Sequence, residues 1–237
     1  IYHTPKPQAE VVELPKVDEA RIRKVIDNCE NGYIGPDEIF ELLDAAGIAQ
    51  KQIRVVDQKQ QALDFANEVG YPLVMKVVGP LHKSDVGGVT LNVRDIETVD
   101  REFDRLMAIP ETYAVEMYPM LDGTEVYIGA IRDEKFGHQV FFGLGGIFIE
   151  VLKDVQNAIA PITACEAKDM LTKLRGYKIL EGVRGQQPVN VDIYAEQVAR
   201  VSALVMVAPE IAEMDLNPLL GNPKNVVAVD ARIRIEK

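Results

Sequence analysis

A histidine stands inside a loop that has the composition of a phosphate-binding loop. Residues 72–93 read PLVMKVVGPLHKSDVGGVTLNV, and the apolar runs LVMKVV and GVTLNV predict a strand on each side of the loop. Glycine lets backbone N–H groups approach a ligand closely, and lysine neutralises anionic oxygens. The pattern indicates phosphate handling, although the Walker A sequence G-x-x-x-x-G-K-[ST] is absent. The residues that could act here are Lys76, His82, Lys83, Ser84, Gly87 and Gly88.

Oxygen-bearing side chains near the C-terminus suggest a magnesium site. In EMDLNPLL, a period of two places Asp215 and Asn217 on one face of a predicted strand. In NVVAVDAR the same period places Asp230 with Arg232, and strand pairing through the GNPKN turn would bring Asn217 close to Asp230. Carboxylate and amide oxygens suit Mg²⁺. The alternative is that Asp215 and Asn217 cap a strand end while Asp230 pairs with Arg232.

A third candidate segment reads VEMYPMLDGTEVYIGAIRD. An apolar strand that ends in Glu116, Met117 and Tyr118 and is interrupted by Pro119 could offer backbone groups to the edge of an adenine base. Glu125 follows at the start of the next predicted strand. A glutamate in a β-rich segment more often lies on a solvated face. This segment alone therefore predicts no site, and we interpret it together with the other two segments.

The composition limits the classes of function. The formal net charge of −11 argues against non-specific nucleic-acid binding, so we expect no nucleic-acid partner. No apolar run approaches the ~18 residues of a membrane span, and no signal-peptide core is visible, so we expect no membrane partner. Cys29 and Cys165 lie far apart without metal-ligand spacing. Reduced thiols in a cytoplasmic protein are the simplest interpretation.

The order of predicted elements indicates an α+β protein with two lobes. Three prolines among residues 2–15 predict an N-terminal arm or linker over residues 1–16. We expect one lobe over about 17–118 and the other over about 119–237. Expected helices cover 18–30, 35–47, 59–70, 95–107, 165–176 and 191–207. Expected strands cover 53–57, 73–78, 88–93, 113–120, 123–133, 138–152, 157–162, 210–220 and 225–236.

Several motifs in one order resemble a known family. The stretches GPDEIFELLDAAGI, HKSDVGGVTLNV, GTEVYIGAIRD, FGLGGIFIEVLKD, MDLNPLL and VVAVDARI are similar to the ATP-grasp subunit or domain of nucleoside-diphosphate-forming acyl-CoA synthetases, in the succinyl-CoA synthetase superfamily. The resemblance is strongest to the β subunit of ADP-forming acetyl-CoA synthetases. It implies an ATP-grasp fold whose two lobes hold the nucleotide between them. It also implies the reaction acyl-CoA + ADP + phosphate ⇌ carboxylic acid + CoA + ATP, with Mg²⁺ and ATP or ADP bound.

The resemblance also implies a role for each candidate residue. Lys76 is similar to the family lysine that contacts nucleotide phosphates, and Asn217 and Asp230 match the magnesium positions. His82 matches the family's phosphate-carrying histidine, because a neutral imidazole can accept a phosphoryl group and release it. The remaining positions are similar to residues around the nucleotide: Lys83, Ser84, Gly87 and Gly88 in the loop over the phosphates, Glu116, Met117, Tyr118 and Pro119 at the adenine, and Glu125 near the ribose or phosphates.

The family reaction also needs a CoA-binding part, which no motif of this sequence indicates. No G-x-G-x-x-G follows a predicted strand, so the CoA-binding part should be an α-type subunit or an upstream domain of the same polypeptide. We expect Glu150, Asp154 and the glycines of FGLGG to face that partner. His3 and His138 receive no role. The sequence does not select the carboxylic acid, ADP or GDP, or the stoichiometry.

Two other functions remain open from the sequence. The first is another ATP-grasp carboxylate ligase, which would form an acyl phosphate but no phosphohistidine. The second is a non-catalytic ATP-grasp portion of a fused protein acetyltransferase. A phosphate label on His82 would exclude the first, and an acetyltransferase domain in the same reading frame would support the second.

Overall fold

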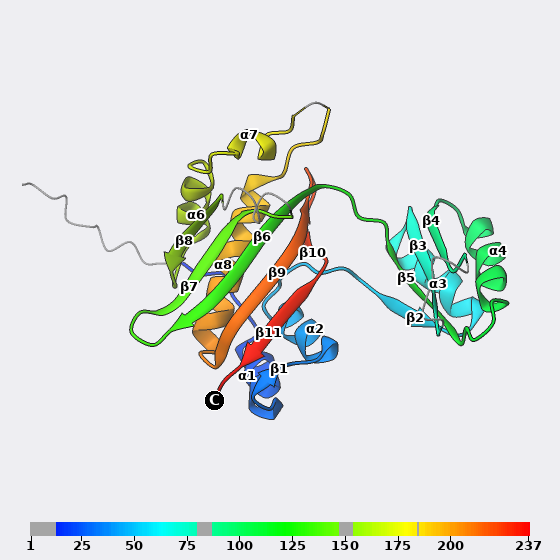
Figure 1. Ribbon diagram of the computed structural model, residues 1–237, viewed down its shortest axis with the longest axis horizontal. Helices are drawn as coiled ribbons and strands as arrows, with labels where there is room; N and C mark the ends of the chain where they lie inside the picture. Colours follow the sequence, from blue (N-terminus) through cyan, green and yellow to red (C-terminus); the bar gives the residue numbers. More distant parts are fainter. Residues whose placement is uncertain (1–12, 80–86, 147–153, 184) are drawn as a thin grey trace, which may run out of the picture. The chain divides into compact units, whose positions relative to one another are not determined.

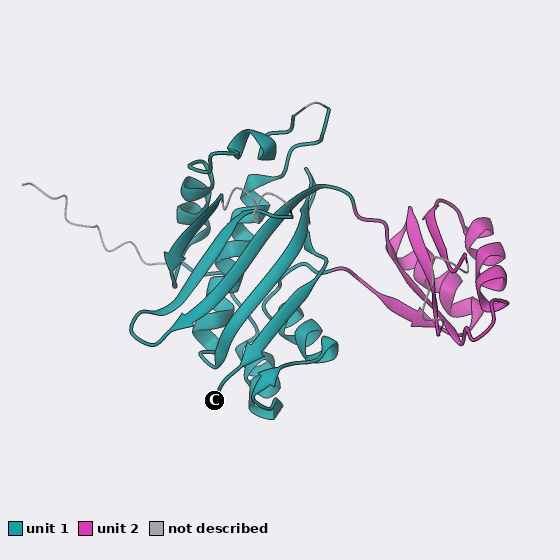
Figure 2. Cartoon of the chain, in the orientation of Figure 1, with its two compact units in different colours: residues 1–50, 122–237 teal, residues 51–121 magenta. Residues whose placement is uncertain are grey.

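The chain is divided into two compact units in a computed structural model that describes residues 13–79, 87–146, 154–183 and 185–237. Unit 1 contains residues 1–50 and 122–237, and unit 2 contains residues 51–121 (Figure 2). The sequence suggests a split at about residues 118–119, and unit 2 ends at residue 121. Residues 17–50, however, belong with the C-terminal part rather than with the first lobe, because β1 pairs with β11 and α1 contacts α8.

Unit 1 is built on an antiparallel sheet with the strand order β1-β11-β9-β6-β7-β8, and β10 also pairs with β9 (Figure 1). Its strands are β1 (Gly32–Tyr33), β6 (Thr124–Asp133), β7 (Gly137–Leu144), β8 (Val155–Ile159), β9 (Ile211–Gly221), β10 (Val226–Ala228) and β11 (Ala231–Ile235). Its helices are α1 (Glu19–Asn28), α2 (Pro36–Ala45), α6 (Ala164–Leu171), α7 (Tyr177–Leu180) and α8 (Val191–Val207).

The core of unit 1 lies between the sheet and α8. Val126 and Ile128 of β6 and Leu216 of β9 are fully buried with α8 residues such as Val198 and Val201. Side chains alternate along a strand, so the residues between them point to the opposite face of the sheet. That face carries Tyr127, Gly129, Glu213, Asp215, Asn217 and Arg232, and we call these six residues the polar face.

Unit 2 is a four-stranded antiparallel sheet with the order β2-β5-β3-β4 and two helices. Its elements are β2 (Arg54–Val56), α3 (Lys59–Val69), β3 (Leu73–Val78), β4 (Val89–Val93), α4 (Ile96–Met107) and β5 (Ala114–Pro119). Phe65 of α3 and Phe103 of α4 pack on Met75 and Met117 of the sheet. Alternation therefore puts Lys76, the neighbour of Met75 on β3, on the face away from the helices.

The expected helices are present, and their ends follow from capping. Asp18 accepts a hydrogen bond from the Arg21 N–H at the start of α1, and Asp95 accepts one from Thr98 at the start of α4. Thr163 and Glu166 form a capping box on α6. No helix in the described part of the chain is long and apolar enough to cross a bilayer.

Three expected elements differ from the structure. The strand expected over 138–152 ends at Leu144 as β7, and residues 147–152 of that range lie outside the described residues. The strand expected over 225–236 is divided into β10 and β11, because Val229 N–H bonds to Pro218 and the Asp230 carboxylate accepts from Ala231 N–H at 2.9 Å. The helix expected over 165–176 ends at Leu171, since the buried Asp154 carboxylate binds the N–H groups of Arg175 and Gly176. Asp154 therefore stabilises this turn, and our expectation that it faces a partner is wrong.

Candidate functional site

The residues expected to bind magnesium lie close together, Asn217 within β9 and Asp230 just before β11. Asp215 is directly opposite Arg232 in the β9–β11 register, and the Asn217 N–H donates to the Asp230 carbonyl oxygen at 3.2 Å. Asn217 Oδ1 and Asp215 Oδ1 are both buried, and neither has a hydrogen-bond donor among the described residues. A buried oxygen without a donor is costly in a folded protein, so these two oxygens call for an external partner.

The alternative interpretation of these residues is wrong in both parts. Asp215 and Asn217 lie inside β9, which runs from Ile211 to Gly221, and do not cap its end. In the portion of the chain that the structure describes, Asp230 makes no ion pair with Arg232; its carboxylate instead accepts the Ala231 N–H. The backbone, and not a salt bridge, thus sets the position of Asp230.

The oxygen set fits a divalent cation. Burial raises the pKa of Asp215; Arg232 opposes this effect, and Glu213 and Asp230 add to it. A bound cation would counter the repulsion among these carboxylates. The described residues contain no cluster of three or more His, Cys, Asp or Glu side chains able to hold a metal. Mg²⁺ usually takes one or two protein carboxylates and completes its shell with waters and phosphate oxygens, so a site for it need not contain such a cluster.

Tyr127 is a member of this site that sequence reasoning missed. Its hydroxyl lies over Gly129, where a Cβ atom would stand, and Gly129 is directly opposite Asp215 on β9. Burial, followed by the charges of Asp215 and Glu213, raises the pKa of Tyr127 to about 12. The phenol therefore keeps its proton at neutral pH and remains a hydrogen-bond donor on the polar face. The alternation of Glu125, Tyr127 and Gly129 along β6 was the sequence signal that could have placed Tyr127 on the polar face.

Gly129→Ala should destabilise unit 1 by about 1–3 kcal/mol, because the new methyl group overlaps the Tyr127 ring and hydroxyl. Urea unfolding of the variant and the parent chain measures this loss. In the double variant Gly129→Ala with Tyr127→Ala the overlap is gone, so the two effects should be strongly non-additive. Additive losses would show that Tyr127 does not occupy the space above Gly129.

Lys76 and the paired glycines lie together in unit 2. Lys76 is half-buried on β3, between Val89 of β4 and Glu116 of β5, and within the described residues it makes no ion pair. Gly88 lies beside β3, because its carbonyl oxygen accepts a hydrogen bond from the Val77 N–H at 2.8 Å. An unpaired ammonium group beside glycine backbone is suited to an anionic ligand.

The expected adenine segment forms the last four residues of β5. Met117 is fully buried in the unit 2 core, so a ligand can reach only its backbone. Pairing of β5 with β2 ends at Met117, and Tyr118 and Pro119 continue along β3 alone. The Lys51 ammonium lies 3.5 Å from the centre of the Tyr118 ring. Burial, and next the Glu116 charge, raises the pKa of Tyr118.

The remaining expected residues are placed as follows. Glu125 is exposed at the start of β6, with its carboxylate against Gly146. His82, Lys83, Ser84 and Glu150 lie outside the described residues, as does His3. His138 is buried and its Nε2 lies 2.7 Å from the Ile211 carbonyl oxygen, which is a structural role.

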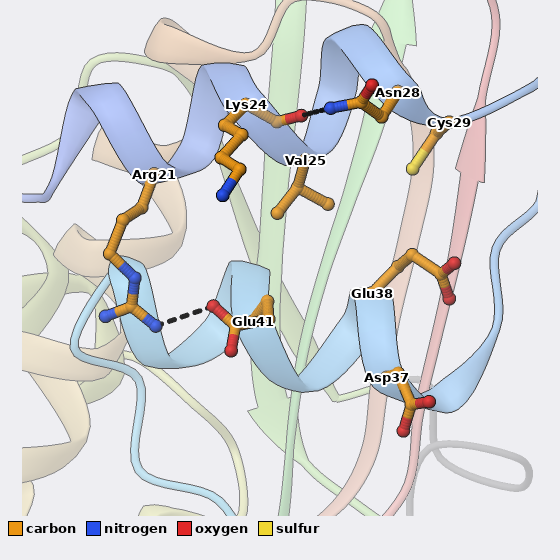
Figure 3. Close-up of a pocket in the computed structure, with 8 residues that line it drawn as sticks. All are labelled: Arg21, Lys24, Val25, Asn28, Cys29, Asp37, Glu38 and Glu41. Atoms are coloured by element: carbon orange, nitrogen blue, oxygen red, sulfur yellow. Dashed lines mark hydrogen bonds and ion pairs between the residues drawn. The ribbon is translucent and has the colours of Figure 1, made fainter.

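The cavities in the described part of unit 1 include two that border α2. One of about 390 Å³ separates α1 from α2, where Arg21 pairs with Glu41 at 2.7 Å and burial raises the pKa of Cys29 (Figure 3). It contains none of the residues that we expect to bind nucleotide or magnesium. The other, of about 500 Å³, is bounded by Asp230 and Arg232 on one side and by residues 33–39 on the other. Asp230, which we expect to bind magnesium, thus lines this second cavity.

Residues 24–235 match the family model of the ATP-grasp domain. The chain is 40% identical to the β subunit of ADP-forming acetate–CoA ligase I of Pyrococcus furiosus, over 90% of this chain and 97% of that subunit. It is 38% identical to ADP-forming acetate–CoA ligase I of Archaeoglobus fulgidus, over 94% of this chain but only 33% of that longer protein.

A solved structure gives the same relationship. The dinucleotide-forming acetyl-coenzyme A synthetase 1 of Candidatus Korarchaeum cryptofilum matches with a TM-score of 0.68 and 34% identity, over 92% of this chain and 100% of that chain. That structure is a complex with coenzyme A and Mg-AMPPCP, and its phosphohistidine segment points towards the nucleotide-binding site.

Proposed function

This chain belongs to the ATP-grasp family, and on that premise we propose that it is the nucleotide-binding part of an ADP-forming acetyl-CoA synthetase. The reaction is acyl-CoA + ADP + phosphate ⇌ carboxylic acid + CoA + ATP. The observation that carries the proposal is the pair of buried oxygens on β9, Asp215 Oδ1 and Asn217 Oδ1, which lack donors within the described residues. Buried oxygens without a hydrogen-bond donor are suited to bind a cation, and Mg²⁺ binds to proteins together with nucleotide phosphates.

Residues of both units take part in phosphoryl transfer, with different roles. In unit 2, Lys76 and the backbone of Gly87 and Gly88 bind nucleotide phosphates, and the backbone from Glu116 to Pro119 holds the base. In unit 1, Asn217 and Asp230 hold Mg²⁺, which when bound neutralises phosphate charge. Glu125 lies near the ribose or phosphates. His82 accepts the phosphoryl group as a nucleophile, while Lys83 and Ser84 flank it.

The lengths of the relatives support a CoA-binding partner. This chain spans nearly all of the Pyrococcus furiosus β subunit and one third of the Archaeoglobus fulgidus protein. An equivalent segment thus occurs both as a separate subunit and within a longer chain. We place this chain in a hetero-oligomer, or beside a CoA-binding domain of the same polypeptide. A cytoplasmic location and the lack of nucleic-acid and membrane partners stay predictions.

The chain alone should bind Mg²⁺–ATP without forming acyl-CoA, and an α-type subunit should restore turnover. Calorimetry measures the first property, and CoA release with acetyl-CoA, ADP and phosphate measures the second. Acyl-CoA synthesis by residues 1–237 alone would contradict the division of labour. Nucleotide binding without turnover in any reconstituted complex would favour a non-catalytic module.

A further inference from the structure

Arg232 is an exposed arginine on the polar face, and the proposed function gives it no role so far. It is the second residue of β11 and lies directly opposite Asp215 of β9 in the strand register. Side chains opposite each other on antiparallel strands have Cβ atoms about 5 Å apart, so an arginine and an aspartate there can form an ion pair. Within the described residues, however, Arg232 forms no ion pair and no side-chain hydrogen bond, and the buried Asp215 Oδ1 has no donor.

The next arginine on the same face of β11 is paired. Arg234 lies opposite Glu213, and its guanidinium is 2.5 Å from a Glu236 oxygen and 3.6 Å from a Glu213 oxygen. The two arginines share one strand and one face, but carboxylates neutralise only Arg234. The donors of the Arg232 guanidinium therefore remain available to an anion, and a phosphate matches their planar, forked geometry.

The cavity beside Arg232 has the charges that a magnesium–phosphate group requires. Its volume is about 500 Å³, and the charged residues that line it in the described part of the chain are Asp230 and Arg232. They are two positions apart where the chain enters β11, a separation of about 7 Å in extended backbone. A carboxylate binds the metal ion and a guanidinium binds a phosphate oxygen. Mg²⁺ at Asp230 and a phosphate group on that ion would span this separation.

The other side of the cavity brings no competing charge. It is lined by one tyrosine, two isoleucines and one proline between residues 33 and 39. No carboxylate of that lining can therefore neutralise the guanidinium before a ligand binds. We propose that Arg232 binds a phosphate oxygen of the nucleotide whose Mg²⁺ is held by Asn217 and Asp230. This inference rests on the proposed function and adds an anion-binding side chain of unit 1 to it.

The test is calorimetry on the full chain with Mg²⁺–ATP as the probe. In Arg232→Met the Kd should rise by about tenfold or more, the loss expected for one hydrogen bond between charged groups. Arg234→Met is the matched control, because it removes the same charge from the same strand face, but from a guanidinium already paired with Glu236. Its Kd should stay within about twofold of the parent value. Arg232→Lys keeps the charge without the fork and should recover part of the loss.

Adenosine is the probe that separates a phosphate contact from a change of structure. It keeps the base and ribose but has no phosphate, so its Kd should be the same for the parent chain and for Arg232→Met. An equal rise of the Kd for adenosine and for Mg²⁺–ATP would overturn the inference, because the loss would then not depend on phosphate.

An Asp215→Asn background separates a direct contact from an effect through Asp215. Arg232→Met also removes the charge opposite Asp215, and in this background that indirect effect is absent. The second substitution should still raise the Kd for Mg²⁺–ATP several-fold, and no further rise would show that Arg232 acts only through Asp215. A parent chain that binds Mg²⁺–ATP while Arg232→Met keeps the same Kd overturns this inference alone. A parent chain that binds no Mg²⁺–ATP overturns the proposed function as well.

Discussion

Replacing His82 by asparagine is expected to abolish phosphoryl transfer through this chain. Asparagine is polar but lacks the ring nitrogen of histidine, which in its neutral form attacks phosphorus. Parent chain incubated with Mg²⁺ and ATP labelled in the γ-phosphate should gain an acid-labile, base-stable label, as a phosphoramidate does. The His82→Asn variant should gain none.

The size of the loss in turnover shows whether His82 carries the phosphoryl group or takes no part in its transfer. Turnover of the complex with an α-type subunit should fall by on the order of a thousandfold or more, as is typical when a covalent nucleophile is removed. Nucleotide affinity should stay nearly constant, because Lys76, Asn217 and Asp230 are unchanged. Ser84→Ala is the control and should keep the label. Near-normal turnover of His82→Asn would instead support an ATP-grasp carboxylate ligase without a phosphohistidine.

Local periodicity was sufficient to predict most elements of both units. The alternation of EMDLNPLL predicted that Asp215 and Asn217 share one face of β9, and the structure shows them there. Periodicity did not predict the break between β10 and β11, because it depends on hydrogen bonds of residues 229 and 231 to partners that a single strand does not reveal. The assignment of residues 17–50 to unit 1 likewise depends on the distant pairing of β1 with β11.

The missed site residues depend on contacts that the sequence does not display. Tyr127 reaches the polar face beside Asp215 only because β6 pairs with β9, with a register shift between Val126 and Ile128, across 88 positions of the chain. The sequence offers Arg232 only as an ion-pair partner of Asp230, and the cavity that both residues line is visible only in the folded unit 1. Asp154 shows the opposite error, since a carboxylate near glycines suggested a partner surface but binds its own backbone.

Removing the two residues that we propose to bind magnesium should weaken Mg²⁺-dependent nucleotide binding by roughly a hundredfold. Asn217→Ala with Asp230→Ala deletes two oxygen ligands, each worth about 1.5 kcal/mol or more as an interaction with a charged group. Calorimetry with ATP in Mg²⁺ and in EDTA isolates the metal-dependent part. Asn225→Ala with Asp169→Ala is the matched control, because both residues are exposed and neither side chain has a described hydrogen bond or ion pair. Unchanged Mg²⁺-dependent affinity in the folded double variant would remove the metal assignment.

Asn217→Ala alone should stabilise the free chain. Asn217 Oδ1 is buried without a donor among the described residues, so the folded protein without nucleotide bears the cost of desolvating it. Asn217→Ala removes that oxygen and should raise the free energy of unfolding by about 1 kcal/mol in EDTA, measured by urea denaturation. With Mg²⁺ and ATP present, the parent chain should gain more stability than the variant, because ligand binding stabilises only the folded state. A variant that is less stable in EDTA would show that Asn217 is retained for folding, since a residue kept for its ligand need not stabilise the empty site.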